Sequence, residues 1–305
     1  MKTITRIVLL AAAAWVVLRL AAGSRKPAET VKFFRTLPSD RPLVIAHRGG
    51  ADLFPENTLA AFKGAVELGV DALELDIHRT ADGVPVVIHD ETVDRTTDGS
   101  GRVDSFTLAE LRRLDAGYRF HPPGSPDEFP YRGRGVAVPT LREVFAALPG
   151  EHLIVEVKED DPAAADLVVA LIREFERTGL TLAASFHHEV LLRFRQVGPE
   201  IATHASRREV IRFLPAAWLG LEGLSSPGFE AFLVPPRSGP LPVATRRFIR
   251  AAGNRNIFTA AWTVNDPAEM ERLLDRGIGG LITDRPVLAR ELVQGSGEPG
   301  AAVRP

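Results

Sequence analysis

The sequence predicts an α/β protein, a TIM (β/α)8 barrel with a short insert after the third strand and an N-terminal hydrophobic segment. Three observations lead to this fold class. Short apolar runs alternate with helical patterns from Leu43 onward, which is typical of a parallel sheet covered by helices. The chain of 305 residues leaves room for the roughly 250 residues that such a barrel needs. Polar residues gather where the predicted strands end, and TIM barrels carry their active sites at that end.

The predicted strands outnumber the eight places of the barrel by one. We therefore expect one of them, Ile201–His204 or Phe229–Val234, to be short or irregular. The apolar runs that predict strands are Leu43–His47, Ala72–Ile77, Pro85–His89, Leu153–Val157, Thr181–Ser185, Ile201–His204, Phe229–Val234, Ile257–Trp262 and Gly280–Thr283.

Helical patterns lie between most of these runs, as a barrel requires. A doubly wound open sheet is the alternative, but no glycine-rich dinucleotide or phosphate-loop fingerprint in the sequence supports it. The predicted helices are Asn57–Leu68, Leu108–Leu114, Leu141–Ala147, Pro162–Thr178, Val190–Gln196, Val243–Ala252 and Pro267–Asp275.

The N-terminus differs from the rest of the chain. Lys2 and Arg6 precede an apolar run from Ile7 to Leu18, which Arg19 interrupts. This pattern predicts that residues 1–24 are a signal peptide or a membrane anchor. We favour the anchor, and the charged flanks argue against a buried core helix. The protein is therefore expected to be membrane-anchored or exported, with the membrane as a partner through this segment, although a cytoplasmic location stays open.

The other boundaries follow from composition. Residues 25–41 are polar and mixed and predict a linker, residues 42–292 form the barrel domain, and residues 293–305 predict a disordered tail. The stretch 91–139 is rich in Gly, Pro, Arg and Asp. A long irregular segment after a strand is usually functional, so we expect it to lie over the barrel mouth.

Bulk composition excludes several classes of function. The net charge of -2 gives no reason to expect a nucleic-acid partner. The sequence contains no cysteine, which excludes disulfides, thiolate metal sites and a cysteine nucleophile.

Two strands carry carboxylates on a face that a barrel encloses. In the run ALELDIH, Glu74 and Asp76 alternate with leucine and isoleucine, and Glu156 does the same in LIVEVK. Enclosed carboxylates repel each other unless a cation compensates them, and oxygen ligands suit one divalent cation, Ca2+ or Mg2+. The alternatives are an exposed polar edge strand and a buried ion pair between Glu156 and Lys158.

Two histidines follow predicted strands. His47 and Arg48 come after the first strand, and His89 comes after the third. A lone histidine is more often structural than catalytic. A pair at the carboxylate end of one barrel, however, is typical of acid–base chemistry near neutral pH.

Eight short motifs in one order resemble a known family, the glycerophosphodiester phosphodiesterases, over about residues 43–290. This family is related to the phosphoinositide phospholipases C. The motifs are HRGG at 47–50, PENT at 55–58, ELD at 74–76, HD at 89–90, EVK at 156–158, SF at 185–186, WTVN at 262–265 and TDRP at 283–286.

The resemblance implies a role for each matching residue. Trp262 would contact the alcohol part of the substrate at the rim, with barrel packing as the alternative, and Asp284 is interpreted as a helix N-cap. The other roles are a metal site of Glu74, Asp76 and Glu156, an acid–base pair of His47 and His89, phosphate binding by Arg48 and Lys158, and a mouth lined by Glu56 and Asn57.

The implied function is metal-dependent hydrolysis of glycerophosphodiesters to an alcohol and sn-glycerol 3-phosphate by histidine acid–base catalysis. The substrate would be a small glycerophosphodiester or a lysophospholipid. Two alternatives remain: a lysophospholipase D, and a non-catalytic lipid- or phosphate-binding barrel. The second is disfavoured because a pure binder needs no acid–base pair.

Overall fold

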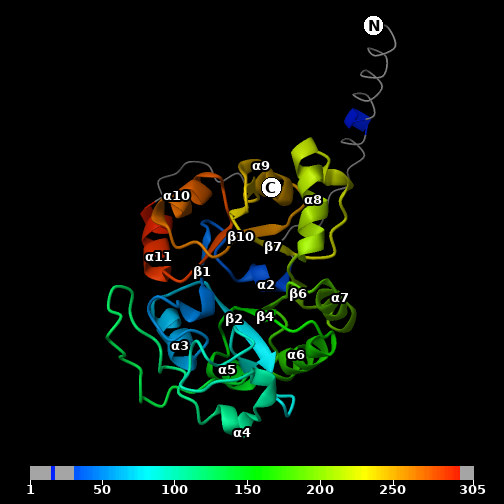
Figure 1. Cartoon of the computed structure of the whole chain (residues 1–305). Coiled ribbons are helices and arrows are strands. Elements are labelled where there is room, and N and C mark those ends of the chain that lie inside the picture. The colour runs from blue at the N-terminus through cyan, green and yellow to red at the C-terminus, as the bar shows by residue number, and fades with distance from the viewer. Residues whose placement is uncertain (1–14, 18–30, 296–305) are drawn as a thin grey trace, which may run out of the picture.

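The computed structural model describes residues 15–17 and 31–295. Figure 1 shows a ring of strands surrounded by helices, so the predicted TIM barrel is confirmed. Eight parallel strands follow one another in the order β6-β5-β4-β2-β1-β11-β10-β7. They are β1 (Leu43–Ala46), β2 (Ala72–Arg79), β4 (Leu153–Val157), β5 (Thr181–Ala184), β6 (Ala202–Thr203), β7 (Ala231–Val234), β10 (Phe258–Ala261) and β11 (Gly280–Thr283).

The ring closes between β6 and β7 through one parallel bridge that pairs His204 with Ala231. β6 is only two residues long, as expected for one of the two strands predicted to be irregular. The helices outside the ring are α3 (Leu59–Glu67), α5 (Leu141–Ala147), α6 (Ala163–Glu174), α7 (His188–Val197), α8 (Arg207–Leu219), α9 (Arg246–Gly253), α10 (Pro267–Asp275) and α11 (Pro286–Gly295).

The surplus strand is the third predicted one, not either of the two that we named. β3 (Pro85–Val87) pairs antiparallel with β2 and stands outside the ring order. The turn after β2 reverses the chain, so β3 forms a hairpin on the end of that strand. Alternating apolar residues predict a strand but not its direction, because both directions share the same period.

The insert between β2 and β4 has a small core of its own. Its buried apolar side chains form a cluster separate from those of the barrel. The insert contains η3 (Val103–Ser105) and α4 (Leu108–Leu111), whose N-cap Thr107 and Glu110 form a capping box. A capping box satisfies two backbone amides that the first turn leaves free. Two further short elements, β8 (Arg237–Ser238) and β9 (Leu241–Pro242), form a hairpin after β7.

The interpretation of residues 25–41 as a linker is wrong for its second half. Residues 32–35 form the helix α2 (Lys32–Arg35), and the side chains of Phe33 and Leu37 are buried. They belong to the cluster of apolar side chains that fills the interior of the barrel. The ring of Phe33 also packs edge-on against His152 at 5.2 Å. This segment therefore belongs to the folded domain.

The remaining predictions at the two ends fall largely outside the described residues. Of the segment 1–24, the structure describes residues 15–17, which are helical and exposed. Of the tail 293–305, residues 293–295 complete α11 and the others lie outside the described range. Within the described ranges, no helix is both long enough and apolar enough to cross a membrane.

Candidate active site

The inward-facing residues of the strands follow a period of two and change character toward the mouth. Leu43 and Ile45 of β1 belong to the interior cluster, and His47 comes next on the same face. Ala72 of β2 is likewise followed by Glu74 and Asp76. A parallel barrel fills its lower layers with apolar side chains. The last inward position of each strand is thereby free to carry chemistry.

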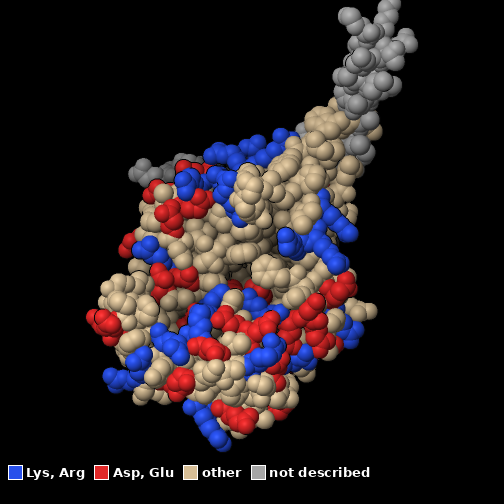
Figure 2. Space-filling view, viewed as in Figure 1, with Lys and Arg blue, Asp and Glu red and all other residues tan. Residues whose placement is uncertain are grey.

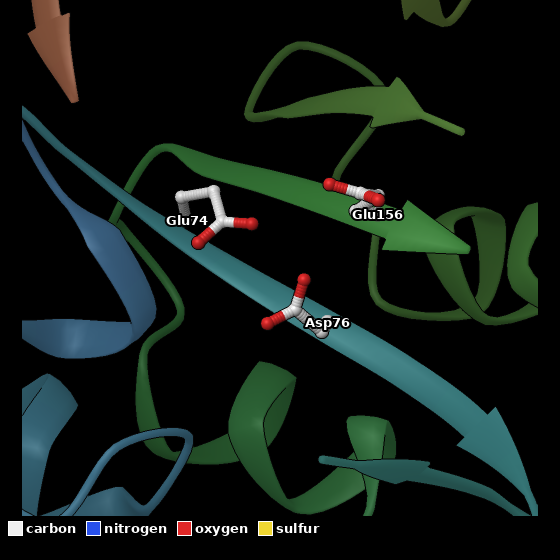
Figure 3. A group of neighbouring side chains, drawn as sticks. All are labelled: Glu74, Asp76 and Glu156. Atoms are coloured by element: carbon white, nitrogen blue, oxygen red, sulfur yellow. The ribbon is translucent and has the colours of Figure 1, made fainter. Parts of the chain in front are cut away.

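The three predicted metal ligands come together. Figure 3 shows Glu74 and Asp76 on β2 and Glu156 on the neighbouring β4, with their carboxylates converging. One carboxylate oxygen of each lies within 4.8 Å of the others. Asp76 and Glu156 are direct partners in the register of β2 and β4, which explains why the sequence spacing produces this cluster.

The electrostatics of this cluster favour a bound cation. Burial, and then the charge of Asp76, raise the pKa of Glu74 to about 8. Burial also raises the pKa of Glu156. Asp76 behaves differently, since Lys158 and Arg48 outweigh its burial and lower its pKa to about 2. A hard divalent cation would restore the charged form of both glutamates, and three carboxylates are the donor set it prefers.

Lys158 lies between two of these carboxylates. Its Nζ is 2.8 Å from Oδ1 of Asp76 and 2.7 Å from Oε1 of Glu156. Burial disfavours its charge, but the two carboxylates outweigh burial and raise its pKa. The ion pair that the sequence offered as an alternative is therefore present, and it shares the site with the acidic cluster instead of replacing it.

Arg48 is held in a left-handed backbone conformation with φ of 51°. Its backbone amide donates to Glu74, and its guanidinium lies 3.2 Å from Asp76 and donates to Glu56 at 3.0 Å. Such a backbone conformation is unfavourable for any residue other than glycine. The next residue, Gly49, has φ of 85°, and a Cβ there would approach that of Ala61 to 2.7 Å. The HRGG turn thus requires its first glycine.

Asn57 fixes the position of Asp76. The side-chain amide of Asn57 donates to Asp76 at 2.9 Å, and its oxygen accepts from the Asp76 backbone amide at 3.2 Å. Glu56 is held by two arginines, Arg48 and Arg95. These arginines outweigh the burial of Glu56 and lower its pKa. Glu56 therefore orients the guanidinium groups of Arg48 and Arg95 at the mouth.

His47 is paired with Asp284, at 2.6 Å between Nδ1 and Oδ1. Burial opposes its protonation, but this contact and the charge of Glu74 outweigh burial and raise the pKa of His47. Asp284 in turn accepts from the side chain of Asn265 at 2.6 Å. The interpretation of Asp284 as a helix N-cap is therefore replaced by a direct contact with His47. Asp284 is the next inward position after Ile282 on β11, so the period-two rule would have found it.

His89 has a carboxylate partner of its own. Its Nδ1 lies 2.6 Å from Oδ1 of Asp90, which Arg95 of the insert also contacts. Burial lowers the pKa of His89, and nearby cations lower it further. His89, Glu56 and Asn57 line one small cavity. The backbone amide of Ile88 donates to the backbone carbonyl of Asp76 at 3.0 Å, so the β3 hairpin holds the segment that carries His89 against β2.

Trp262 lies at the rim, where the last inward position of β10 would fall. It packs against the interior cluster, and its ring meets that of Phe186 edge-on at 5.6 Å. Phe186 is 50% exposed, and Nζ of Lys158 lies 5.8 Å from its ring centre. The barrel packing offered as the alternative for Trp262 is therefore present, and its contact with the substrate stays a prediction. The sequence analysis included Asp90 and Phe186 in motifs without giving them a role, and it did not single out Arg95.

Comparison with known proteins agrees with this geometry. Residues 47–288 match the model of the glycerophosphoryl diester phosphodiesterase family. A glycerophosphodiester phosphodiesterase of Caldanaerobacter subterraneus is 34% identical over 84% of this chain and all of its own length. A Bacillus subtilis glycerophosphodiester phosphodiesterase is 32% identical over 85% of this chain and 89% of its own.

Solved structures show the same fold. A putative glycerophosphoryl diester phosphodiesterase of Silicibacter pomeroyi superimposes with a TM-score of 0.70 and 25% identity, over 88% of this chain and 98% of its own. An Oleispira antarctica phosphodiesterase, solved with the product sn-glycerol-3-phosphate, gives a TM-score of 0.65 and 25% identity, over 83% of this chain and 97% of its own.

Fold, site and relatives together define a TIM-barrel enzyme, a phosphoric diester hydrolase. Within that class, the chain belongs to the glycerophosphoryl diester phosphodiesterase family. The resemblance found in the eight motifs is thereby confirmed.

Proposed function

We propose that this enzyme hydrolyses glycerophosphodiesters to an alcohol and sn-glycerol 3-phosphate, with one divalent cation, Ca2+ or Mg2+, at its carboxylate cluster. The single observation that carries this proposal is the convergence of Glu74, Asp76 and Glu156 within 4.8 Å of one another. The Oleispira antarctica relative holds the same product class, which supports the choice of substrate.

The cluster and the two cations beside it suit an anionic phosphodiester. A divalent cation on the three carboxylates would polarise a phosphoryl oxygen and neutralise charge. Arg48 and Lys158 stand next to the same carboxylates and can bind the remaining phosphoryl oxygens. Preorganised positive charge of this kind stabilises the charge that develops during phosphoryl transfer.

Two protons have to move during the reaction. The nucleophile, water or the neighbouring glycerol hydroxyl, must lose one, and the departing alcohol oxygen must gain one. His47 and His89 each keep Nδ1 on a carboxylate partner, which leaves Nε2 for the substrate. The pKa of His47 is raised and that of His89 is lowered. This divergence favours His47 as the acid and His89 as the base.

A second candidate function, lysophospholipase D, has one observation in its favour. Phe186 and Trp262 form an apolar rim beside Lys158, and this rim would accept an acyl chain or the carbon face of glycerol. A non-catalytic barrel is disfavoured, because two carboxylate-paired histidines serve proton transfer better than binding.

One assay separates the three functions. Release of glycerol 3-phosphate from glycerophosphocholine is measured beside release of choline from lysophosphatidylcholine, each with and without a chelator and with Ca2+ or Mg2+ restored. We expect chelation to stop turnover of glycerophosphocholine and the restored ion to recover it. Faster turnover of the lysolipid would favour lysophospholipase D, and binding of either compound without turnover would favour the binder. Full activity after exhaustive chelation would refute the metal site.

A further inference from the structure

One helix of the barrel turns an apolar stripe toward solvent. On α8, Ile211, Pro215, Trp218 and Leu219 are all exposed. Their spacing of four, three and one residues places them along one face. The opposite face, with Phe213 among its residues, is buried in the barrel. α8 is therefore apolar on both sides, which a helix that faces only water does not need.

The exposed apolar side chains of the molecule are concentrated at this place. Of the thirteen large ones in the described ranges, seven lie on α8, on η4 (Glu222–Leu224) or in residues 15–17. Single exposed apolar side chains are normal, whereas a contiguous group marks an interaction surface. The seven are Trp15, Val16, Val17, Ile211, Trp218, Leu219 and Leu224.

A cluster of arginines borders this stripe. Arg246, Arg247 and Arg250 of α9 line a cavity of about 360 Å³ that also reaches the end of α8. Its one acidic side chain, Glu222, accepts a hydrogen bond from Asn254 at 2.8 Å. Three arginines against one glutamate leave the cavity positive. Figure 2 shows Lys and Arg gathered over α9 beside the uncharged surface of α8.

The N-terminal segment meets the same end of α8. The indole Nε1 of Trp15 donates to the backbone oxygen of Leu219 at 2.8 Å. Residues 15–17 belong to the apolar run Ile7–Leu18, which predicts a signal peptide or a membrane anchor. Figure 1 places residues 15–17 beyond the end of α8. The stripe, the arginines and residues 15–17 therefore occupy one side of the molecule.

We propose that this α8–α9 surface, formed by Ile211, Trp218, Leu219, Arg246 and Arg250, docks the barrel on a bilayer of anionic phospholipids. Apolar side chains would enter the interface, and the arginine cavity would take lipid phosphates. An apolar face beside cationic side chains is the pattern of interfacial helices, and tryptophan favours the depth of the headgroups. This inference goes beyond the proposed activity, since none of these residues belongs to the catalytic site.

The absence of cysteine from the sequence allows a direct test. Leu219→Cys and, as the control, Arg113→Cys are made in the full chain and labelled with an environment-sensitive fluorophore. Arg113 is exposed just after α4, which Figure 1 shows on the opposite side of the barrel from α9. On vesicles with anionic lipid we expect a blue shift at position 219 and quenching by nitroxide lipids. Neither effect is expected at position 113.

The contribution of charge is tested by Arg246→Gln with Arg250→Gln in the labelled Leu219→Cys chain. Each arginine near an anionic bilayer is worth about a factor of five in binding, so the pair should lower the ratio of docked to undocked barrel roughly 30-fold at low salt. The matched control, Arg112→Gln with Arg113→Gln, removes the same charge from the other side and should change nothing. Unchanged turnover of glycerophosphocholine shows that each variant is folded.

Three results would overturn the proposal. The label at position 219 could stay in water on vesicles that the protein binds, which would mean that the N-terminal segment alone holds the chain. The blue shift could be equal on purely zwitterionic vesicles. It could also appear without vesicles and grow with protein concentration, which would identify the surface as a contact between copies of this chain.

Discussion

The two sides of the barrel mouth differ in chemistry although their strands share one geometry. On β2 and β4 the upper inward positions are Asp76 and Glu156, whereas on β5 the partner of Glu156 is Ala184 and on β10 the last inward position falls at Trp262. Figure 2 shows charged side chains crowded on the lower side of the mouth and uncharged surface above it. The difference shows that the ring itself needs only small or apolar inward residues. Buried charge on β2 and β4 is therefore explained by function.

The largest effect is expected from the carboxylates of the charged side. Glu74→Gln or Glu156→Gln should abolish turnover and weaken binding of Ca2+ or Mg2+, because each removes a charged oxygen ligand. Activity and calorimetric metal affinity are the measurements. Glu67→Gln, an exposed glutamate at the end of α3, is the control. Wild-type turnover by Glu74→Gln would mean that the cluster is structural.

The same glutamate predicts how stability depends on pH. The folded pKa of Glu74 is raised from 4.5 to about 8, so its protonated form stabilises the folded state. This contribution is complete below about pH 4.5 and is lost as the pH rises through about 8. Thermal unfolding of the chelated protein should show this loss, and added Ca2+ or Mg2+ should reverse it. Glu74→Gln should show a smaller loss, because Glu156, whose pKa is also raised, keeps its own contribution.

The histidines come next in size. His47→Ala or His89→Ala should lower turnover of glycerophosphocholine roughly a hundred- to ten-thousandfold, the usual worth of a positioned acid or base. Metal affinity should be nearly unchanged. A nitrophenyl ester of glycerol phosphate, whose leaving group needs no proton, should rescue the variant that lost the acid, which we expect to be His47→Ala. Near wild-type rates in both variants would end the acid–base proposal.

A smaller effect is expected from Asp284, which acts through His47. Asp284→Asn should lower turnover about tenfold, less than loss of the imidazole itself. It should also move the pH profile to lower pH, since the contact with Asp284 helps to raise the pKa of His47. The limb that belongs to His47 moves in this direction whether the residue serves as acid or base. Lower turnover with an unmoved profile would point to a structural role only.

The smallest effect on catalysis is expected below the mouth. Phe33→Ala should cost about 3–5 kcal/mol of stability, because Phe33 is 2% exposed inside the ring, while turnover per folded molecule stays the same. Removing residues 1–30 should leave the melting temperature unchanged, whereas removing residues 1–41 should lower it. Equal melting temperatures for the two truncations would mean that α2 does not stabilise the barrel.

The sequence predicted an element correctly where its apolar residues fall on one face and its polar residues on the other. The alternation in β2 predicted its strand, its enclosed face and its carboxylates together. The sequence analysis did not predict α8, although Ser206 and Glu209 form a capping box at its N-terminus. The exposed stripe and Pro215 inside the helix obscure the usual pattern of one apolar face. Contacts between distant segments, such as His47 with Asp284, leave no local periodicity to read.

The junction of β6 and β7 is where we expect the closed ring of strands to open first. One bridge between His204 and Ala231, with the Glu230 carboxylate accepting from the backbone amide of Thr203, holds this junction, whereas β2 and β4 are paired over five residue positions. Thermal opening takes the least stable path, so amide hydrogens along β6 should exchange with solvent before those of β2. We expect such an opening to leave Glu74 and Asp76 in place, because β5 and β4 lie between β6 and β2. The barrel can thus open locally at the junction of β6 and β7 while the carboxylates of β2 keep their positions.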